Sequence, residues 1–144
     1  MLSISDKLLQ EIMHHAEFHY PEEGAGLLLG QFRGDFRTAV QLLPLKNQVQ
    51  ASSRHNRYRI EPEDMIRAEL KAEELGLDII GVFHSHPNHP AVPSEFDRER
   101  ALPWYSYVIT QIDGTGALES RSWRLSDDRQ FLEEEIFIQS SEVL

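Results

Sequence analysis

Two histidines near the middle of the chain have the spacing of a metal chelate. His84 and His86 close an apolar run that we expect to be a β-strand, in which side chains at i and i+2 lie on the same face. Asp97 follows after a loop that contains three prolines, so two imidazoles and one carboxylate lie within fourteen residues. Two neutral imidazoles and a carboxylate bind zinc with one position left for water, as in catalytic sites. The pattern therefore predicts a metal hydrolase.

A hydrolase of this kind also needs a base and a hydrogen-bond donor for the oxyanion. Glu22 and Glu23 are candidates for the base, because they precede an apolar strand and two glycines, at positions 24 and 26, that would leave room for a substrate. The Ser94 hydroxyl is a candidate for the oxyanion donor, since it lies three residues before Asp97. Taken alone, Ser94 and Asp97 are also typical of a capping box at a helix N-terminus.

Composition narrows the fold class and the partners. The 144 residues fit a single domain spanning 1–144, and the absence of cysteine excludes disulfides, thiolate zinc sites and a cysteine nucleophile. The formal net charge of -10 disfavours a nucleic-acid partner, and no apolar run approaches the roughly 20 residues that cross a membrane. The first residues lack the pattern of a signal peptide, so we expect a cytoplasmic protein. The oligomeric state has no sequence signal.

Hydrophobic periodicity and turn residues predict a chain of mixed helices and strands. Ser5 is a plausible N-cap for the first helix, while Pro62 and Gly76 bound the second. In chain order we expect a helix at 5–19, a strand within 22–32, a strand at 36–43 that ends at Pro44, a loop at 44–57, a short strand at 58–60, a helix at 62–75, a central strand at 77–86, a short helix from 94, and a hairpin of strands at 106–112 and 117–125. Residues 131–138 fit either a strand or a short helix.

The remaining histidines and one acidic run have simpler explanations than catalysis. His15 and His19 are one helical turn apart, but two histidines alone leave a metal under-coordinated. We expect solvated positions for His14, His15 and His19 on the helix flank and for His89, which could alternatively touch substrate, while His55 has no companion in the sequence. The run Glu133-Glu134-Glu135 is expected to form a solvated face.

The spacing of the candidate ligands resembles the motif of the JAMM metalloproteases, also called the JAB1/MPN/Mov34 family. His84-x-His86, seven residues, Ser94, two residues and Asp97 reproduce its order and spacing. Residues 21–30 are similar to the second motif of that family, in which a glutamate opens the first strand before small residues and a Gly-Leu-Leu pattern. In this register Glu23, and not Glu22, takes the place of the catalytic acid.

The resemblance implies an α/β fold of the α+β type, a curved mixed β-sheet flanked by helices as in cytidine-deaminase-like proteins. It implies one catalytic Zn²⁺ on His84, His86 and Asp97, with Glu23 as general acid/base and Ser94 stabilising the oxyanion. Family members cleave the bond after the Gly-Gly tail of ubiquitin or ubiquitin-like proteins. Eukaryotic deubiquitinases of the family carry insertions after the motif, and the short segment between Asp97 and Trp123 has no room for them. In this respect the chain resembles the small stand-alone prokaryotic type, which is associated with ubiquitin-like sulfur-carrier proteins. We therefore expect a substrate of that kind.

Three other functions deserve comparison with this hypothesis. A non-catalytic MPN scaffold would have the same fold, but such proteins generally lack the ligands that are complete here. A non-haem iron oxygenase also uses two histidines and a carboxylate. In its usual order one histidine and the acid are close together and the second histidine lies far downstream, unlike this sequence. RadC-like relatives in DNA repair have a similar ligand pattern, and the acidic charge of this chain argues against a DNA partner.

Overall fold

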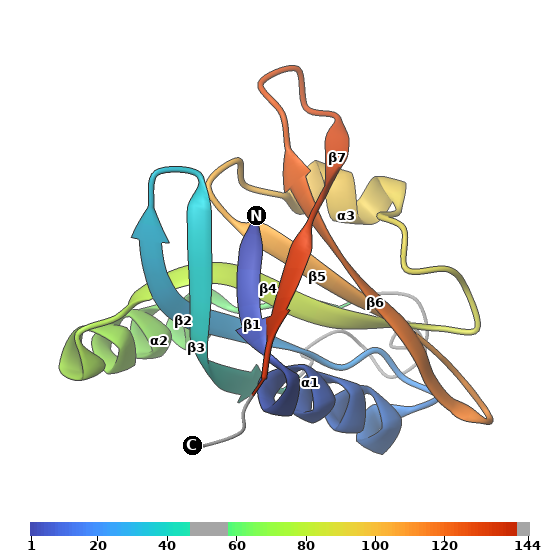
Figure 1. The fold of residues 1–144 in the computed structure, drawn as a ribbon. Coiled ribbons are helices and arrows are strands. Elements are labelled where there is room, and N and C mark those ends of the chain that lie inside the picture. The colour runs from blue at the N-terminus through green and yellow to red at the C-terminus, as the bar shows by residue number, and fades with distance from the viewer. Residues whose placement is uncertain (47–57, 141–144) are drawn as a thin grey trace.

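The computed structural model describes residues 1–46 and 58–140, which contain three helices and one mixed sheet. The elements are β1 (Leu2–Ser5), α1 (Asp6–His19), β2 (Ala25–Arg33), β3 (Phe36–Leu45), α2 (Pro62–Leu75), β4 (Asp78–Pro87), α3 (Glu95–Arg100), β5 (Ser106–Asp113), β6 (Gly116–Leu125), β7 (Phe131–Glu134) and β8 (Ile136–Gln139) (Figure 1). The sheet has eight strands in the order β7-β6-β5-β4-β2-β3-β1-β8. This architecture confirms the predicted curved mixed sheet flanked by helices.

Strand β4 lies in the middle of the sheet and carries the two histidines. It pairs antiparallel with β2 and parallel with β5, and every residue from Ile80 to Pro87 is buried. A strand that is buried on both faces needs an apolar sequence throughout, which explains the run that precedes His84. The His84 backbone therefore has a paired strand on each side, whereas His86, one step beyond the pairing with β2, pairs with Gln111 of β5.

Helices α1 and α2 cover opposite faces of the central strands (Figure 1). In α1 the Ser5 side chain caps the helix by accepting from the Leu8 N–H at 3.1 Å, and Ile12 and Ala16 are buried. Ile12 packs with Phe83 of β4 in one apolar cluster. The adjacent Val82 faces the other way and packs with Ala68 of α2 in a second cluster. The alternation of β4 thus separates an α1 face from an α2 face.

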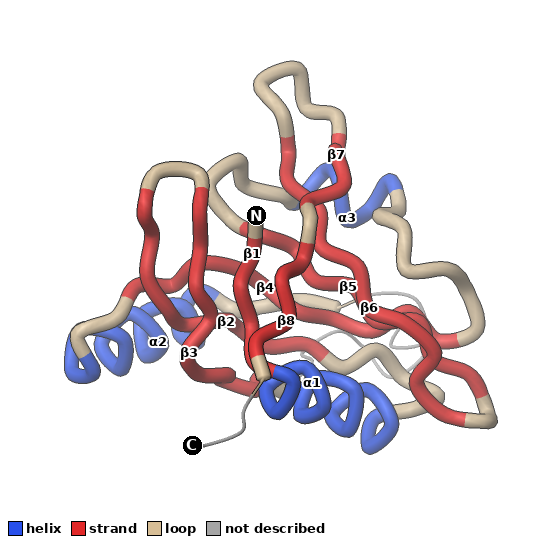
Figure 2. Tube along the Cα trace, viewed as in Figure 1, coloured by secondary structure: helices blue, strands red, loops and turns tan. Residues whose placement is uncertain are grey.

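The last two strands connect opposite ends of the sheet order. β7 pairs antiparallel with β6, whereas β8 pairs parallel with β1, and a single residue, Glu135, separates β7 from β8. Figure 2 shows the chain passing from one strand to the other with no helix between them. The sheet is consequently curled, and the segment Phe131–Gln139 spans its two ends.

Several predictions about helices and strands were wrong. The structure contains a strand, β1, before the first helix, and β3 continues through Pro44, which pairs with Gly26. Residues 58–60 are not a strand, and 131–138 form two strands in place of one element. His55 and most of the predicted loop at 44–57 lie outside the described residues. Within those residues, no helix is long and apolar enough to cross a membrane.

Glu134 is buried, contrary to the expectation that the run at 133–135 is solvated. Its carboxylate accepts from the hydroxyls of Ser106 at 2.7 Å and Ser122 at 2.9 Å, and the other oxygen lies 3.3 Å from the amino group of Met1. The Arg37 guanidinium also donates to Ser106 at 3.1 Å. This network joins strands from both ends of the sheet order.

Replacing Glu134 by Gln should destabilise the protein by about 1–3 kcal/mol, because an ionised acceptor in a buried network is lost while its partners stay buried. The free energy of unfolding from urea denaturation measures the effect. Glu135→Gln is the matched control, since the side chain of Glu135 is exposed. Equal stabilities of the two variants would contradict the importance of this network.

Candidate metal centre

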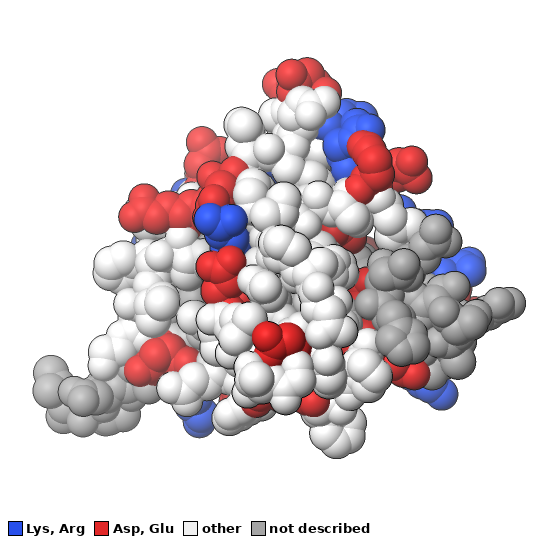
Figure 3. Space-filling model, turned by 90° about the vertical axis from the view of Figure 1, so that its right-hand side faces the viewer, with Lys and Arg blue, Asp and Glu red and all other residues white. Residues whose placement is uncertain are grey.

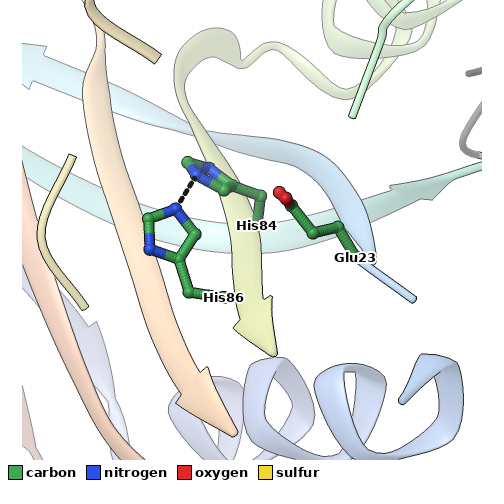
Figure 4. Close-up of side chains that lie close together, drawn as sticks. All are labelled: Glu23, His84 and His86. Atoms are coloured by element: carbon green, nitrogen blue, oxygen red, sulfur yellow. Dashed lines mark hydrogen bonds between the residues drawn. The ribbon is translucent and has the colours of Figure 1, made fainter. Parts of the chain in front are cut away.

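His84 and His86 point from β4 toward the same side, as the period of two predicts. Figure 4 shows both imidazoles next to each other, with the Glu23 carboxyl group directed toward them from the start of β2. The two Nε2 atoms are 3.2 Å apart, and both side chains are almost completely buried. The Tyr58 ring stacks on the His84 ring with centroids 4.3 Å apart, and this contact restricts the orientation of that imidazole.

Asp97 reaches the same point from the first turn of α3. Its carboxylate oxygens lie 3.3 Å from His84 Nε2 and 3.1 Å from His86 Nε2. The Ser94 side chain accepts from the Asp97 N–H at 3.1 Å, and the Asp97 carboxylate accepts from the Ser94 N–H at 2.8 Å. Both hydrogen bonds of a capping box are present, and the box orients the carboxylate toward the histidines. The Asp97 side chain therefore takes part in the helix cap and is also the candidate ligand.

The distances among these three side chains fit the coordination of a small divalent cation. Nitrogen and oxygen ligands at about 2.0–2.1 Å from a tetrahedral ion are separated from one another by roughly 3.3 Å. The three separations here are 3.1, 3.2 and 3.3 Å. Ligand atoms of Glu23, His84 and His86 also lie within 4.8 Å of one another. Asp97 is closer to both imidazoles than this, so the distances favour Asp97 over Glu23 as a third ligand.

Hydrogen bonding fixes which nitrogen of His86 faces the centre. His86 Nδ1 lies 2.8 Å from the carbonyl oxygen of Pro90, which can only accept, so Nδ1 carries the proton. The Nε2 lone pair is then free for a metal, and such a second hydrogen bond is the usual way in which a ligating histidine is oriented. Among the described residues His84 Nδ1 has no partner and is held by packing alone.

The charges of the site favour a cation. Burial by itself would raise the pKa of Asp97, but interaction with His84 and hydrogen bonds from both histidines and the Ser94 backbone hold that pKa well below its usual range. Burial lowers the pKa of His84, with Asp97 opposing the shift. The site thus combines a carboxylate that stays ionised with a neutral imidazole, which is the protonation state that metal binding requires.

Glu23 is the acid whose pKa differs most clearly from Asp97. It is buried, and burial together with the nearby Asp97 charge raises its pKa to about 9. A pair of carboxyl groups with pKa values shifted in opposite directions is typical of sites in which one acid stays charged and the other carries a proton. The structure brings together all five residues predicted from the sequence, with Ser94 taking part through the capping box.

The glycines of the acidic motif make room for protein side chains and not for a substrate. A Cβ on Gly24 would lie 2.9 Å from the His15 ring, and one on Gly26 would lie 2.3 Å from the Phe83 ring. His15 therefore packs against Gly24 and Phe83, and its burial lowers its pKa to about 4. The expectation that His15 is solvated was wrong, because the start of β2 crosses the helix at this point.

Two further residues contact the histidines. His89 stacks on His86 with ring centroids 4.3 Å apart and planes at 3°, so it is not a freely solvated loop residue. Tyr58 is buried against His84, although nothing in its spacing from other residues indicated this contact. The side chain of Ser85, between the two histidines, points to the opposite face of β4 and accepts a hydrogen bond from the Gly24 N–H.

Comparison with known proteins gives one consistent result. A family model described as prokaryotic homologs of the JAB domain matches residues 5–126. A desampylase from Haloferax volcanii is 36% identical over 110 residues, which cover 76% of each chain. A probable TtuB-protein conjugate cleaving protease from Thermus thermophilus is 32% identical, over 81% of this chain and 74% of its own. The fold is similar to that of a JAB1/MPN domain protein from Archaeoglobus fulgidus, with a TM-score of 0.60, 21% identity and coverage of 94% and 97%.

The raised pKa of Glu23 predicts how the stability of the metal-free protein depends on pH. Between pH 7 and 9 the folded protein keeps this proton while the unfolded chain, with a pKa near 4.5, has lost it, so stability falls as pH rises. The loss is up to about 2–3 kcal/mol over these two pH units. His15 does not contribute here, because it titrates below pH 7 in both states.

Glu23→Gln should remove most of this slope, since glutamine has no proton to release. Urea unfolding of chelator-treated protein at several pH values measures it. An unchanged slope in the variant would assign the effect to another group.

Proposed function

The chain belongs to the prokaryotic JAB domain family, and from that premise we propose that it is a zinc-dependent peptidase or isopeptidase. In this proposal one Zn²⁺ binds to His84, His86 and Asp97, and the enzyme cleaves the bond that follows the Gly-Gly tail of a ubiquitin-like protein, such as a sulfur carrier. The observation that carries the proposal is the convergence of two histidines and Asp97 at 3.1–3.3 Å, with the Glu23 carboxyl group beside them.

Zinc is the metal that best suits these donors. Two imidazole nitrogens, one carboxylate and no thiolate form the ligand set of hydrolytic zinc sites, which keep a fourth position open. Bound there, zinc would acidify a water molecule and polarise the substrate carbonyl. The remaining chemistry belongs to residues of the chain.

Glu23 is the group that moves the proton in this proposal. Its carboxylate accepts a proton from water as the carbonyl is attacked, and the protonated acid then donates that proton to the leaving amine. A positive charge bound nearby would lower its pKa from about 9 toward neutrality, where one group serves best in both roles. Ser94 can donate to the carbonyl oxygen as negative charge develops, because its Oγ accepts from Asp97 N–H and its own proton is available.

The surroundings suit an extended and largely uncharged peptide. Two clefts lie next to residues that contact the site: one of 360 Å³ is lined in part by Tyr58, which stacks on His84, and one of 390 Å³ is lined in part by Ser94, which caps Asp97. Figure 3 shows a face on which uncharged side chains predominate, with separate acidic groups among them and most of its Lys and Arg near the edge. A Gly-Gly segment lacks side chains and can pass a buried site that other residues could not enter. The names of the relatives, which refer to conjugate cleavage, support the same class of substrate.

The proposal is tested with ubiquitin-like sulfur-carrier proteins extended by a short peptide beyond the Gly-Gly end. Incubation with the zinc-loaded protein should release the extension, and intact mass should show one cut after the second glycine. Chelation should stop cleavage, and zinc should restore it at about one ion per chain. The matched control substrate has Ala-Ala in place of Gly-Gly.

A non-catalytic scaffold with the same fold is the alternative, and it predicts no cleavage. Hydrolysis that persists in metal-free protein would reject the zinc mechanism, while zinc binding without cleavage of any carrier would favour the scaffold.

The assignment of the base is tested by two neighbouring variants. Glu23→Gln should lower kcat by about 10²–10⁴-fold and leave one zinc bound, because the proton carrier is lost and the ligands remain. Glu22→Gln should retain activity within a few fold. Loss of activity in Glu22→Gln alone would reverse the assignment.

A further inference from the structure

Glu23 lies just outside the regular ladder of the sheet. β2 begins at Ala25, which pairs with His84, so Glu23 and Gly24 precede the first paired residue of this strand. A residue in that place has no fixed position unless other contacts hold the chain. The carboxyl group of Glu23 nevertheless has to stay within 4.8 Å of the two imidazoles.

Ser85 extends the ladder by one step. Its backbone N–H donates to the Gly24 carbonyl oxygen at 3.0 Å, and its side-chain Oγ accepts from the Gly24 N–H at 2.8 Å. Both polar groups of Gly24 are thus bound by one residue. Ser85 is 1% exposed, so no solvent competes for these bonds.

The position of Ser85 follows from the alternation of β4. His84 and His86 face the side of Tyr58 and Asp97, and the side chain between them must face α1. From that face only a short hydroxyl can reach back to the Gly24 amide. An apolar side chain would leave this buried N–H without an acceptor.

The His15 ring holds the same segment from the other direction. It lies against Gly24, where an added Cβ would be 2.9 Å away, and it is supported by an edge-to-face contact with Phe83 at 5.2 Å. Gly24 is therefore enclosed between α1 and β4, one residue from the carboxyl group that faces the metal centre.

We propose that Ser85 is a positioning residue, which holds Glu23 at the metal centre through its two hydrogen bonds to Gly24. The proposal rests on the proposed function for its effect on catalysis, but the hydrogen bonds can be tested without it. It assigns the two faces of the His84-Ser85-His86 segment to different parts of one site: the histidines hold the metal, and the serine holds the base.

The catalytic test uses Ser85→Ala in the zinc-loaded protein. We expect kcat to fall about 10- to 100-fold with KM changed less than twofold, because a small displacement of the base reduces the rate more than binding. Zinc content should stay at one per chain. Ser85→Thr, which retains a hydroxyl, should recover most of the rate. Ser122→Ala is the matched control, since it removes a buried hydroxyl that bonds to Glu134 on another strand.

A double-mutant cycle separates positioning from general stability. In a Glu23→Gln background, Ser85→Ala should have no further effect on the residual rate, because it acts through the same carboxyl group. A Ser85→Ala variant with wild-type kcat, or with a loss no greater than that of Ser122→Ala, would overturn the proposal.

Hydrogen exchange tests the clamp independently of any activity. In Ser85→Ala the Gly24 amide should exchange at least tenfold faster, and in Ser85→Thr it should remain protected. If the wild-type protein cleaves no carrier but Gly24 behaves in this way, the proposed function fails and the clamp stands. Unchanged Gly24 exchange in Ser85→Ala overturns the clamp.

Discussion

The structure depends on holding two imidazole nitrogens 3.2 Å apart in a buried place, with a carboxylate against both. Two lone pairs facing each other at that distance are unfavourable in a medium of low polarity unless a proton or a cation lies between them. Flexible side chains on a loop would move apart. The protein places His84 and His86 on its central strand, and it brings in Asp97 by a capping box that also begins α3. Regular backbone structure thus supplies the rigidity that the site requires.

The sequence predicts the candidate metal ligands because their geometry is local. A spacing of two on a strand and a cap three residues before an acid are both short-range relations, so the proximity of His84, His86 and Asp97 could be predicted without knowledge of the fold. The assignment of Glu23 is different, since its distance from β4 depends on the pairing of β2 with that strand. Composition and periodicity left it equivalent to Glu22, and only the family motif separated the two.

The features that the sequence did not predict also depend on contacts between residues that are far apart in the chain. Strand β1 has four residues and is stabilised by neighbours that are remote in the chain, so its own pattern was too short to be noticed. The burial of Glu134 depends on serines from two other strands, and the contact of His15 with Gly24 depends on how α1 crosses β2. In each case a polar residue was interpreted from its local neighbours, whereas its environment comes from other elements.

The curled sheet has a consequence for the order of folding. Residues of the candidate metal centre lie between positions 23 and 97, but β1 completes its pairing only when Leu2 meets Ile136, more than 130 residues later. Contacts of such sequence separation form late, and during synthesis they must wait until residue 139 has left the ribosome. The first strand therefore stays without one neighbour for most of translation, and the unpaired backbone N–H and C=O groups on that edge can pair with another chain. Its length of four residues keeps that exposed edge short.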